Sequence, residues 1–245
     1  MTTFVRLDSL LRDQCFDTPG ENSENLRIYA RFMALVENVM VVLSDLRDNS
    51  CCIFPGLFGR SLGIMHESSG DSIWEDEILR LMDSGEREAK FLAELRFISY
   101  LRRLPRHLRQ RHYLVTRLRF RPGDGDGVEV LHRMHYVYDA ESDAIRYSVC
   151  VYQPLVGDLG ARSIVVDSVT GCREELTASD DGQILSRRER QVLSLIDSGQ
   201  TSREIASMLS ISLHTVSRHR QAILAKLNVK NSVEACRVAK MLKII

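Results

Sequence analysis

The sequence predicts two domains of different fold class: an α+β N-terminal domain with one antiparallel sheet and helices, and an all-α C-terminal domain of four helices. Helical and strand-like patterns are mixed in residues 1–182, whereas residues 183–245 show helical patterns alone. The charge divides at the same place, with 22 Lys+Arg against 29 Asp+Glu in residues 1–182 and 11 against 4 in residues 183–245. A larger acidic domain is therefore expected to carry a small basic one, which suits a polyanionic partner.

The domain boundaries follow from composition. Residues 177–183 are polar, contain Gly182 and show no periodicity, so they form the best linker in the sequence. We expect an N-terminal helical segment over 1–35, the α+β domain over 36–155, an extension with the linker over 156–182, and the helical domain over 183–245.

The first half of the N-terminal domain combines helices with a strand pair. Apolar residues at Leu26, Tyr29, Phe32, Met33 and Val36 have helical spacing, and Pro105 ends or kinks the longest helix. The predicted helices are Leu26–Glu37, Ile73–Met82 and Glu86–Arg103, and the predicted strands are Val39–Leu43 and Ser50–Phe54.

The second half of this domain carries the clearest sheet signal. Three alternating segments, His112–Arg121, Val128–Tyr138 and Ala144–Tyr152, are joined by turn-rich segments and predict three sequential antiparallel strands. Ser163–Val169 is a further candidate strand. One face of the middle strand carries Val128, Val130, His132, Met134, Tyr136 and Tyr138, a stripe typical of core that also suits the wall of a ligand pocket.

Four short helices are predicted at the C-terminus. Ser186 with Glu189 and Thr201 with Glu204 have the spacing of capping boxes, and Gly199 lies where a helix C-cap is expected. The third helix is predicted over Leu213–Leu227 and the fourth over Ser232–Leu242. Two short capped helices joined by a tight turn are typical of a DNA-reading helix-turn-helix.

On a helical wheel the third helix has two different sides. Val216, Ile223 and Leu227, with Arg220, lie on the side that must pack on the bundle. The opposite arc carries small and polar side chains that suit base edges in a major groove, where Arg218 could pair with guanine and Gln221 with adenine. We predict base contacts by Ser217, Arg218 and Gln221, and phosphate contacts by Lys226 and by the start of the preceding helix at Thr201, Ser202 and Arg203.

The C-terminal residues resemble the LuxR-type (GerE-like) helix-turn-helix. The resemblance lies in Leu185–Leu193, Gly199, Glu204–Ala206, Ile211–Ser212, Thr215–Val216, His219–Arg220, Ile223, Lys226–Leu227 and Val229. It implies that the third helix enters the major groove and that Thr215 and Lys226 contact phosphate. It also implies that the fourth helix, with Val233, Cys236 and Lys240, forms a two-fold dimer contact. Ser217 replaces a basic residue common at its position, so base preference cannot be transferred from relatives.

The N-terminal domain resembles a PAS domain in its order of elements. A strand pair, the segment Gly59–Gly63, short helices and three antiparallel strands follow one another within residues 36–155. The resemblance implies a small-molecule ligand or cofactor on the inner sheet face, or a dimerisation role; the ligand itself is unknown. A homoserine-lactone-type receptor is the alternative, but it is disfavoured because Trp74 is the one tryptophan and the W-x-x-x-Y spacing is missing.

Neither a metal site nor an enzyme is expected. His132 and His135 are three residues apart in a strand and so point to opposite faces, where they cannot bind one ion together. We therefore predict no metal site. The arginines between Arg102 and Arg121 are expected to pair with acids of their own domain, with DNA contact as the alternative. The sequence lacks G-x-S-x-G, Walker and G-x-G-x-x-G motifs.

These patterns together predict a cytoplasmic, sequence-specific DNA-binding transcriptional regulator. The expected partners are double-stranded DNA and a second copy of the chain, with RNA polymerase as a further protein partner. No membrane association is expected, because no apolar run approaches the roughly 20 residues that span a bilayer. The alternative class is a protein-interaction or scaffold protein whose helix-turn-helix no longer binds DNA.

Overall fold

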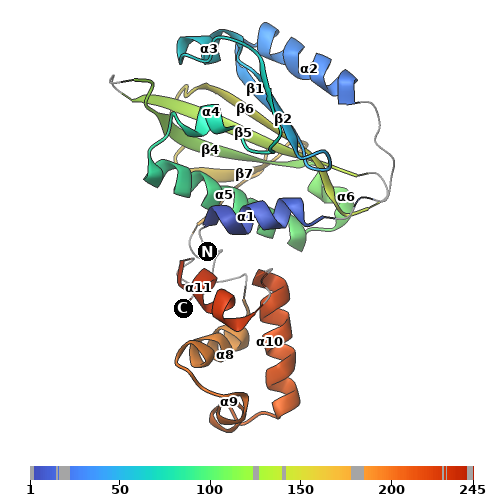
Figure 1. The fold of residues 1–245 in the computed structure, drawn as a ribbon, viewed down its shortest axis with the longest axis vertical. Coiled ribbons are helices and arrows are strands. Elements are labelled where there is room, and N and C mark those ends of the chain that lie inside the picture. The colour runs from blue at the N-terminus through green and yellow to red at the C-terminus, as the bar shows by residue number, and fades with distance from the viewer. Residues whose placement is uncertain are drawn as a thin grey trace. The chain divides into compact units, whose positions relative to one another are not determined.

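The chain forms two compact units in a computed structural model (Figure 1): residues 11–176, and residues 177–245 together with 1–10. The structure describes residues 3–14, 16, 23–123, 127–139, 142–177, 185–227, 229, 231–241 and 245. The side chains of residues 23, 225, 226, 238 and 241 are not described. The predicted linker is therefore largely outside the described residues.

The larger unit is built on one antiparallel sheet of eight strands in the order β3-β2-β1-β6-β5-β4-β7-β8. The hairpin β1–β2 joins the meander β4–β5–β6 through pairing of β1 with β6. This arrangement confirms the predicted α+β class. The strands are β1 Met40–Asp45, β2 Ser50–Phe54, β3 Ser68–Gly70, β4 His112–Phe120, β5 Val128–Tyr138, β6 Ile145–Pro154, β7 Ser163–Asp167 and β8 Arg173–Glu175.

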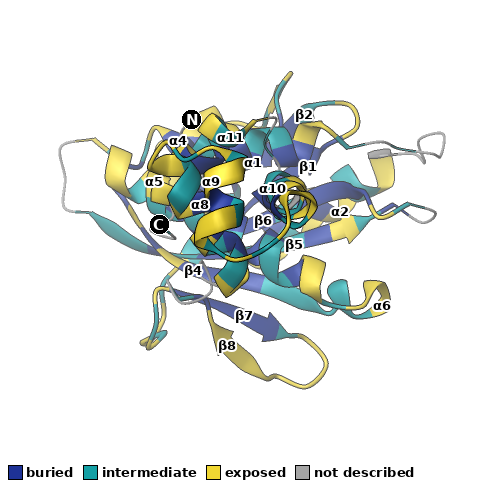
Figure 2. Cartoon of the chain, turned by 90° about the horizontal axis from the view of Figure 1, so that it is seen from below, coloured by how far each residue is buried: buried dark blue, intermediate teal, exposed yellow. Residues whose placement is uncertain are grey.

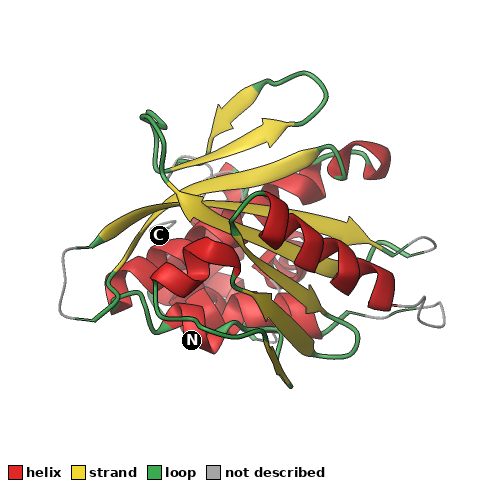
Figure 3. Cartoon of the chain, turned by 90° about the horizontal axis from the view of Figure 1, so that it is seen from above, coloured by secondary structure: helices red, strands yellow, loops and turns green. Residues whose placement is uncertain are grey.

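Helices cover both faces of the sheet (Figures 1 and 3). On one face, Ala30 and Ala34 of α2 (Ser23–Val36) pack with Val41, Leu43 and Val151 in an apolar cluster. The long helix α5 (Ser84–Arg103) lies on the opposite face and buries Phe91, Leu95, Ile98 and Leu101 among others. The remaining helices up to residue 176 are α1 Thr3–Arg12, α3 Gly56–Ser61, α4 Asp76–Leu79 and α6 Arg106–Arg109.

Three local predictions need correction. The helix expected over Ile73–Met82 is reduced to α4, because Ile73 and Trp74 are buried in an irregular segment that leads into its first turn. The strands β3 and β8 were not predicted, because each has three mostly polar residues with no alternation. Figure 2 shows β8 exposed beside the buried strand β7.

The smaller unit contains the predicted helical bundle. Its helices are α8 Arg187–Asp197, α9 Ser202–Met208, α10 Leu213–Leu227 and α11 Ser232–Met241. The four elements, and the bounds of the third, agree with the prediction. Its core is formed by Leu185, Val192, Leu193, Ile205, Val216, Ile223, Leu227, Ala235 and Ala239, all buried.

Candidate functional site

The helix-turn-helix is held at its helix starts by two capping boxes. The Ser186 side chain accepts a hydrogen bond from the Glu189 backbone N–H, and the Glu189 carboxylate accepts one from the Ser186 N–H at 2.7 Å. Thr201 and Glu204 repeat this exchange at the start of α9. Each box satisfies backbone donors that the first turn of a helix otherwise leaves unpaired. Both boxes were predicted from their spacing.

Two residues with a left-handed backbone conformation form the turns before and after α9. Gly199 has a φ of +82° just after α8, a conformation that glycine adopts without strain. Ser210 has a φ of +52° in the turn between α9 and α10. Ser212 then caps α10, because its hydroxyl accepts from the Thr215 backbone N–H at 3.0 Å. The short α9 and the longer α10 are thereby fixed as the two helices of the motif.

The inner side of α10 anchors the helix in the bundle. Val216, Ile223 and Leu227 are buried, as the helical wheel predicts. The Arg220 guanidinium donates to the hydroxyls of Ser202 and Ser232, both at 2.9 Å. Arg220 therefore ties α10 to the starts of α9 and α11, which rigidly orients the outer side of the helix.

The outer side of α10 is open to solvent. The side chains of Ser217, Arg218 and Gln221 are exposed, and all three lie in the first nine residues of the helix. A helix that enters a major groove contacts base edges with this part of its length. The structure therefore brings the three predicted base-contacting residues together on one accessible arc.

The predicted phosphate-contacting residues are of two kinds: three have hydroxyl groups that are engaged within the domain, and two have cationic side chains. Thr201 donates its hydroxyl to Glu204 at 2.7 Å, and the Ser202 hydroxyl accepts from Arg220, so both hydroxyls serve the domain itself. The Thr215 hydroxyl lies 2.9 Å from that of Ser212. Arg203 is exposed. Lys226 lies in the last turn of α10, but its side chain is outside the described residues.

Two of the three residues predicted for the dimer contact on α11 are exposed. Val233 is 81% exposed, and Lys240 is exposed while pairing with Asp197 at 2.8 Å. Cys236 is buried, and its thiol donates to the Leu193 carbonyl of α8 at 3.9 Å. The thiol therefore belongs to the core of the bundle, and of the three predicted positions only Val233 and Lys240 are open to a partner.

A second unusual feature lies inside the sheet domain. The Lys90 ammonium on α5 contacts Glu75 at 2.9 Å and Glu94 at 2.6 Å, and all three side chains are at most 4% exposed. The Tyr152 hydroxyl on β6 donates to Glu75 at 2.7 Å. Charged groups are costly to bury even when they are paired, so the triad of Glu75, Lys90 and Glu94 is a candidate functional site. We call Glu75, Lys90, Glu94 and Tyr152 the buried polar centre.

The protonation of the buried polar centre is set by competition between burial and charge. Burial lowers the pKa of Lys90, but the neighbouring carboxylates outweigh it and the pKa is raised. Burial raises the pKa of Glu75, yet the Lys90 charge and the hydrogen bonds from Lys90 and Tyr152 bring it below its ordinary value. The pKa of Glu94 is raised by burial and by the charge of Glu75. Glu94 is therefore the carboxyl group that takes up a proton most readily.

Several buried polar atoms have no hydrogen-bond partner among the described residues. Those that lie on the sheet face of the buried polar centre are the two ring nitrogens of His132, the hydroxyl of Tyr136 and the hydroxyl of Thr116, all buried. His132 stacks on Tyr152, with ring centroids 4.6 Å apart. A cavity of about 20 Å³, room for one water molecule, is lined by Trp74, Glu75, Lys90, Glu94, Ser148 and Cys150 among others. This face can accept further hydrogen bonds.

The histidines of β5 predict how the domain responds to acid. Burial and the Lys90 charge hold the pKa of His132 well below its ordinary value, and burial lowers the pKa of His135 to about 4. The unfolded chain binds these protons near pH 6.5 and the folded chain does not, so stability is expected to fall as the pH drops below 6.5. Each histidine contributes a slope of up to about 1.4 kcal/mol per pH unit. Glu94 opposes them, because its raised pKa favours the folded state in acid.

The measurement is urea unfolding between pH 7.5 and 5, followed by the fluorescence of buried Trp74, the single tryptophan. His132→Leu should reduce the slope by about one proton. His107→Gln, at an exposed histidine, is the control and should leave the slope unchanged. If the pH dependence of the unfolding free energy is the same in His132→Leu as in wild type, this imidazole is protonated equally in the folded and unfolded states.

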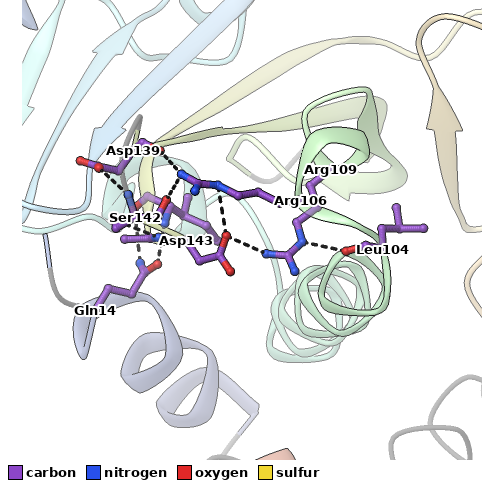
Figure 4. A network of polar contacts seen from close by, with 9 residues as sticks. Gln14, Leu104, Arg106, Arg109, Asp139, Ser142 and Asp143 are labelled. Atoms are coloured by element: carbon purple, nitrogen blue, oxygen red, sulfur yellow. Dashed lines mark hydrogen bonds and ion pairs between the residues drawn. The ribbon is translucent and has the colours of Figure 1, made fainter. Parts of the chain in front are cut away.

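The arginine-rich segment pairs with acids of its own domain, as predicted. Figure 4 shows Arg106 and Arg109 converging on Asp143, at 3.3 and 3.4 Å. Arg106 also donates to the Ser142 carbonyl at 2.7 Å. Further pairs join Arg111 with Asp167, Arg117 with Glu129 and Arg121 with Asp83. These arginines stabilise loops and strand ends of the sheet domain.

Other predicted positions are also located by the structure. His132 and His135 lie on opposite faces of β5, where they stack on Tyr152 and Tyr113 respectively. Within the part of the chain that is described, no group of three His, Cys, Asp or Glu side chains is arranged to hold a metal ion. No helix among the described residues is long and apolar enough to cross a bilayer.

The buried polar centre was missed at the sequence level, although a signal was present. Lys90 and Glu94 occupy positions on the same helical stripe as Ile98 and Leu101, which are buried. A charged pair four residues apart within an apolar stripe indicates a buried ion pair. Glu75 and Tyr152 carry no such signal, because only the fold brings them to α5.

Comparison with known proteins identifies the helical domain. Residues 183–239 match the family model for bacterial regulatory proteins of the luxR family. The oxygen regulatory protein NreC of Staphylococcus epidermidis is 38% identical over 72 residues, which cover 29% of this chain and 33% of NreC. The uncharacterized response regulatory protein YgeK of Escherichia coli is 43% identical over 61 residues, covering 25% of this chain and 41% of YgeK. The chain thus spans about a third of the length of the curated relatives it matches.

Solved structures align with more of the chain but only loosely. The VqmA dimer of Vibrio cholerae without its target DNA aligns over 92% of this chain and 89% of VqmA, with a TM-score of 0.32 and 15% identity. An RNA-binding light-oxygen-voltage receptor aligns over 81% of this chain and 47% of its own, with a TM-score of 0.32 and 12% identity. Alignments at this level do not bear on function. The family match does: residues 183–239 are similar to the regulatory domain of the luxR family.

Proposed function

We propose that this chain is a sequence-specific DNA-binding transcriptional regulator in which α10 enters the major groove. The observation that carries the proposal is the exposed arc of Ser217, Arg218 and Gln221 on a rigidly anchored helix within a luxR-family domain. Arg218 is suited to bidentate contact with guanine, and Gln221 to contact with adenine. Ser217 would contribute a short polar contact between them.

Phosphate contacts would position the domain on the duplex. Arg203 and Lys226 supply the cationic side chains at two ends of the motif, with Thr215 near the start of α10. Ser202 and Arg203 would act through their backbone N–H groups in the first turn of α9, whereas Thr201 holds Glu204 with both its N–H and its hydroxyl. Counterion release at these contacts would make binding fall steeply with salt.

The regulator would act as a homodimer with RNA polymerase as a further partner. Two copies of α10 must lie about 34 Å apart to enter successive major grooves on one side of the duplex. Val233 and Lys240 on α11 are the exposed positions for the two-fold contact in the helical domain. The proposed domain organisation is a helical segment over 1–35, the sensor or dimerisation domain over 36–155, an extension with the linker over 156–182 and the DNA-binding domain over 183–245.

The sheet domain would supply the input. Its buried polar centre borders a small cavity, and unpaired polar atoms lie on the same sheet face. A small polar molecule that widens this cavity would satisfy these atoms and exchange a proton with Glu94. Such binding would stabilise the domain, so a ligand from the native host should raise its unfolding midpoint.

Alanine substitutions on α10 separate base reading from general DNA binding. Arg218→Ala and Gln221→Ala are each expected to weaken the preferred site by about 1–3 kcal/mol, with little effect on bulk DNA. Lys226→Ala should weaken all sequences alike and reduce the salt dependence. The preferred site would be found by selection from random duplexes, and affinities measured by fluorescence anisotropy at several salt concentrations.

Arg187→Ala is the matched control, because Arg187 is an exposed arginine of the same domain outside α9 and α10. It removes the same charge and should leave sequence preference intact. Equal losses on preferred and bulk DNA in Arg218→Ala and Gln221→Ala would refute base reading. Such a result would favour a domain that contacts protein.

A further inference from the structure

The outward side of α2 carries an apolar stripe. The inward side of the helix is small, since buried Ala30 and Ala34 pack against the sheet. On the outward side, five large apolar side chains are between 52% and 73% exposed: Ile28, Tyr29, Phe32, Leu35 and Val36. We call these five residues the α2 stripe. Figure 3 shows α2 lying over the sheet, with its other side turned away from the strands.

The α2 stripe is large for the surface of a monomer. Five large side chains exposed by more than half leave on the order of 500 Å² of apolar area, near the upper end for a single patch. A stable interface buries roughly 800 Å² on each partner. The α2 stripe supplies more than half of that area, and the adjoining helix α3 adds the exposed Leu57.

The spacing of the α2 stripe is symmetric. Relative to Phe32, the other four residues lie at −4, −3, +3 and +4. A second copy of the helix laid antiparallel over the first therefore repeats the same pattern. Phe32 would face Phe32 at the two-fold axis, Ile28 would face the partner's Leu35, and Tyr29 would face the partner's Val36. Self-complementarity of this kind is the property of an isologous two-fold contact.

Charges border the α2 stripe without entering it. Arg31 pairs with Glu67 at 2.8 Å, and Glu37 at the end of the helix pairs with Arg133 at 3.3 Å. An apolar centre with a polar margin is the usual anatomy of a protein–protein interface. Because the margin charges are already paired within the domain, the centre offers an uncharged surface to a partner.

We propose that the α2 helices of two copies pack antiparallel through the α2 stripe and form the dimer contact of the N-terminal domain. The inference rests on the proposed function, because a regulator of a two-fold DNA site needs two copies held together. It adds a second contact, separate from α11, through which a change in the sheet domain reaches the spacing of the two α10 helices.

The first test is the oligomeric state of the full chain by sedimentation equilibrium. Wild type is expected to be dimeric at micromolar concentration. Phe32→Glu places two carboxylates against each other at the axis and should raise the dissociation constant at least 100-fold. Val156→Glu is the matched control, an apolar-to-Glu change at an exposed residue of the same compact unit, residues 11–176, and should leave the dimer intact. An unaltered dimer in Phe32→Glu, or a monomeric wild type, would overturn the proposal.

Disulfide trapping tests the register. In a chain whose exposed Cys172 is replaced by Ser, Phe32→Cys should cross-link two copies on mild oxidation. Ile28→Cys alone should not, whereas a mixture of Ile28→Cys and Leu35→Cys chains should. Efficient self-cross-linking of Ile28→Cys would indicate a parallel pair and overturn the antiparallel arrangement.

DNA binding distinguishes this inference from the proposed function. Phe32→Glu should keep its preference for the selected sequence while losing at least tenfold in affinity for the complete two-fold site. If wild type is a dimer through the α2 stripe but prefers no DNA sequence, the interface stands and the proposed function fails. If wild type prefers a sequence and Phe32→Glu remains dimeric, the function stands and the interface fails.

Discussion

Replacing Lys90 by Met is expected to lower the free energy of unfolding of the sheet domain by about 3–5 kcal/mol. The change keeps the length of the side chain but leaves Glu75 and Glu94 facing each other without the intervening cation. Two buried carboxyl groups without a counter-charge must take up a proton or let water in, and either costs stability. Urea unfolding followed by Trp74 fluorescence measures the loss.

Two controls define the origin of that loss. The triple variant Glu75→Gln, Lys90→Met, Glu94→Gln removes all three charges and should recover most of the stability. Arg31→Ala breaks an exposed ion pair of the same domain, and its unfolding midpoint should stay close to that of wild type. A Lys90→Met variant as stable as wild type would show that the centre is hydrated and that its charges do not depend on one another.

A Glu94→Gln variant tests the sensing role of the buried polar centre. If the buried polar centre receives a ligand, ligand-dependent changes in DNA binding should disappear in Glu94→Gln, which keeps the shape of the side chain. The helical domain should retain its sequence preference in that variant. A response preserved in Glu94→Gln would place the input elsewhere in the sheet domain.

Gly56→Ala is expected to destabilise the sheet domain by about 3 kcal/mol or more. Gly56 begins α3 with a φ of +56°, where an L side chain costs about 1–2 kcal/mol. A Cβ at this position would overlap the carbonyl oxygen of Val39 and lie 2.7 Å from that of Ala34. Both neighbours are backbone atoms, so the end of α2 would have to move away from the sheet.

Gly63→Ala separates the cost of the positive φ from the cost of the steric overlap at Gly56. Gly63 also has a positive φ, +93°, but a Cβ there meets nothing within 4 Å. Its cost should therefore be limited to about 1–2 kcal/mol of backbone strain. Urea unfolding of the two variants at one pH gives the comparison. Equal losses would mean that the close approach at Gly56 is relieved without cost.

The elements that the sequence predicted best are those with local determinants. The bounds of α10, β2 and β5 agree with the prediction, because apolar periodicity and caps are encoded within each segment. The capping boxes at Ser186 and Thr201 and the turn at Gly199 depend on residues no more than a few positions apart. The exposed arc of Ser217, Arg218 and Gln221 likewise follows from the geometry of one helix.

Elements without such determinants were missed. The strands β3 and β8 are short and polar, and each forms only because a neighbouring strand offers its backbone groups. The helix expected from Ile73 shrank to α4 because Ile73 and Trp74 pack into the core instead of continuing a helical turn. Burial of these side chains depends on α5 and the sheet, which local patterns do not contain.

The sequence by itself determined the two fold classes, the helix-turn-helix and the residues on its outer face, because caps, turns and a 3.6-residue period are local properties. Tertiary structure alone decided which side of α2 is buried. Alanines there allow close packing on the sheet, so the larger apolar residues remain outside. It also decided the buried polar centre, since Glu75, Lys90 and Tyr152 come from an irregular segment, a helix and a strand that only folding brings within hydrogen-bond distance.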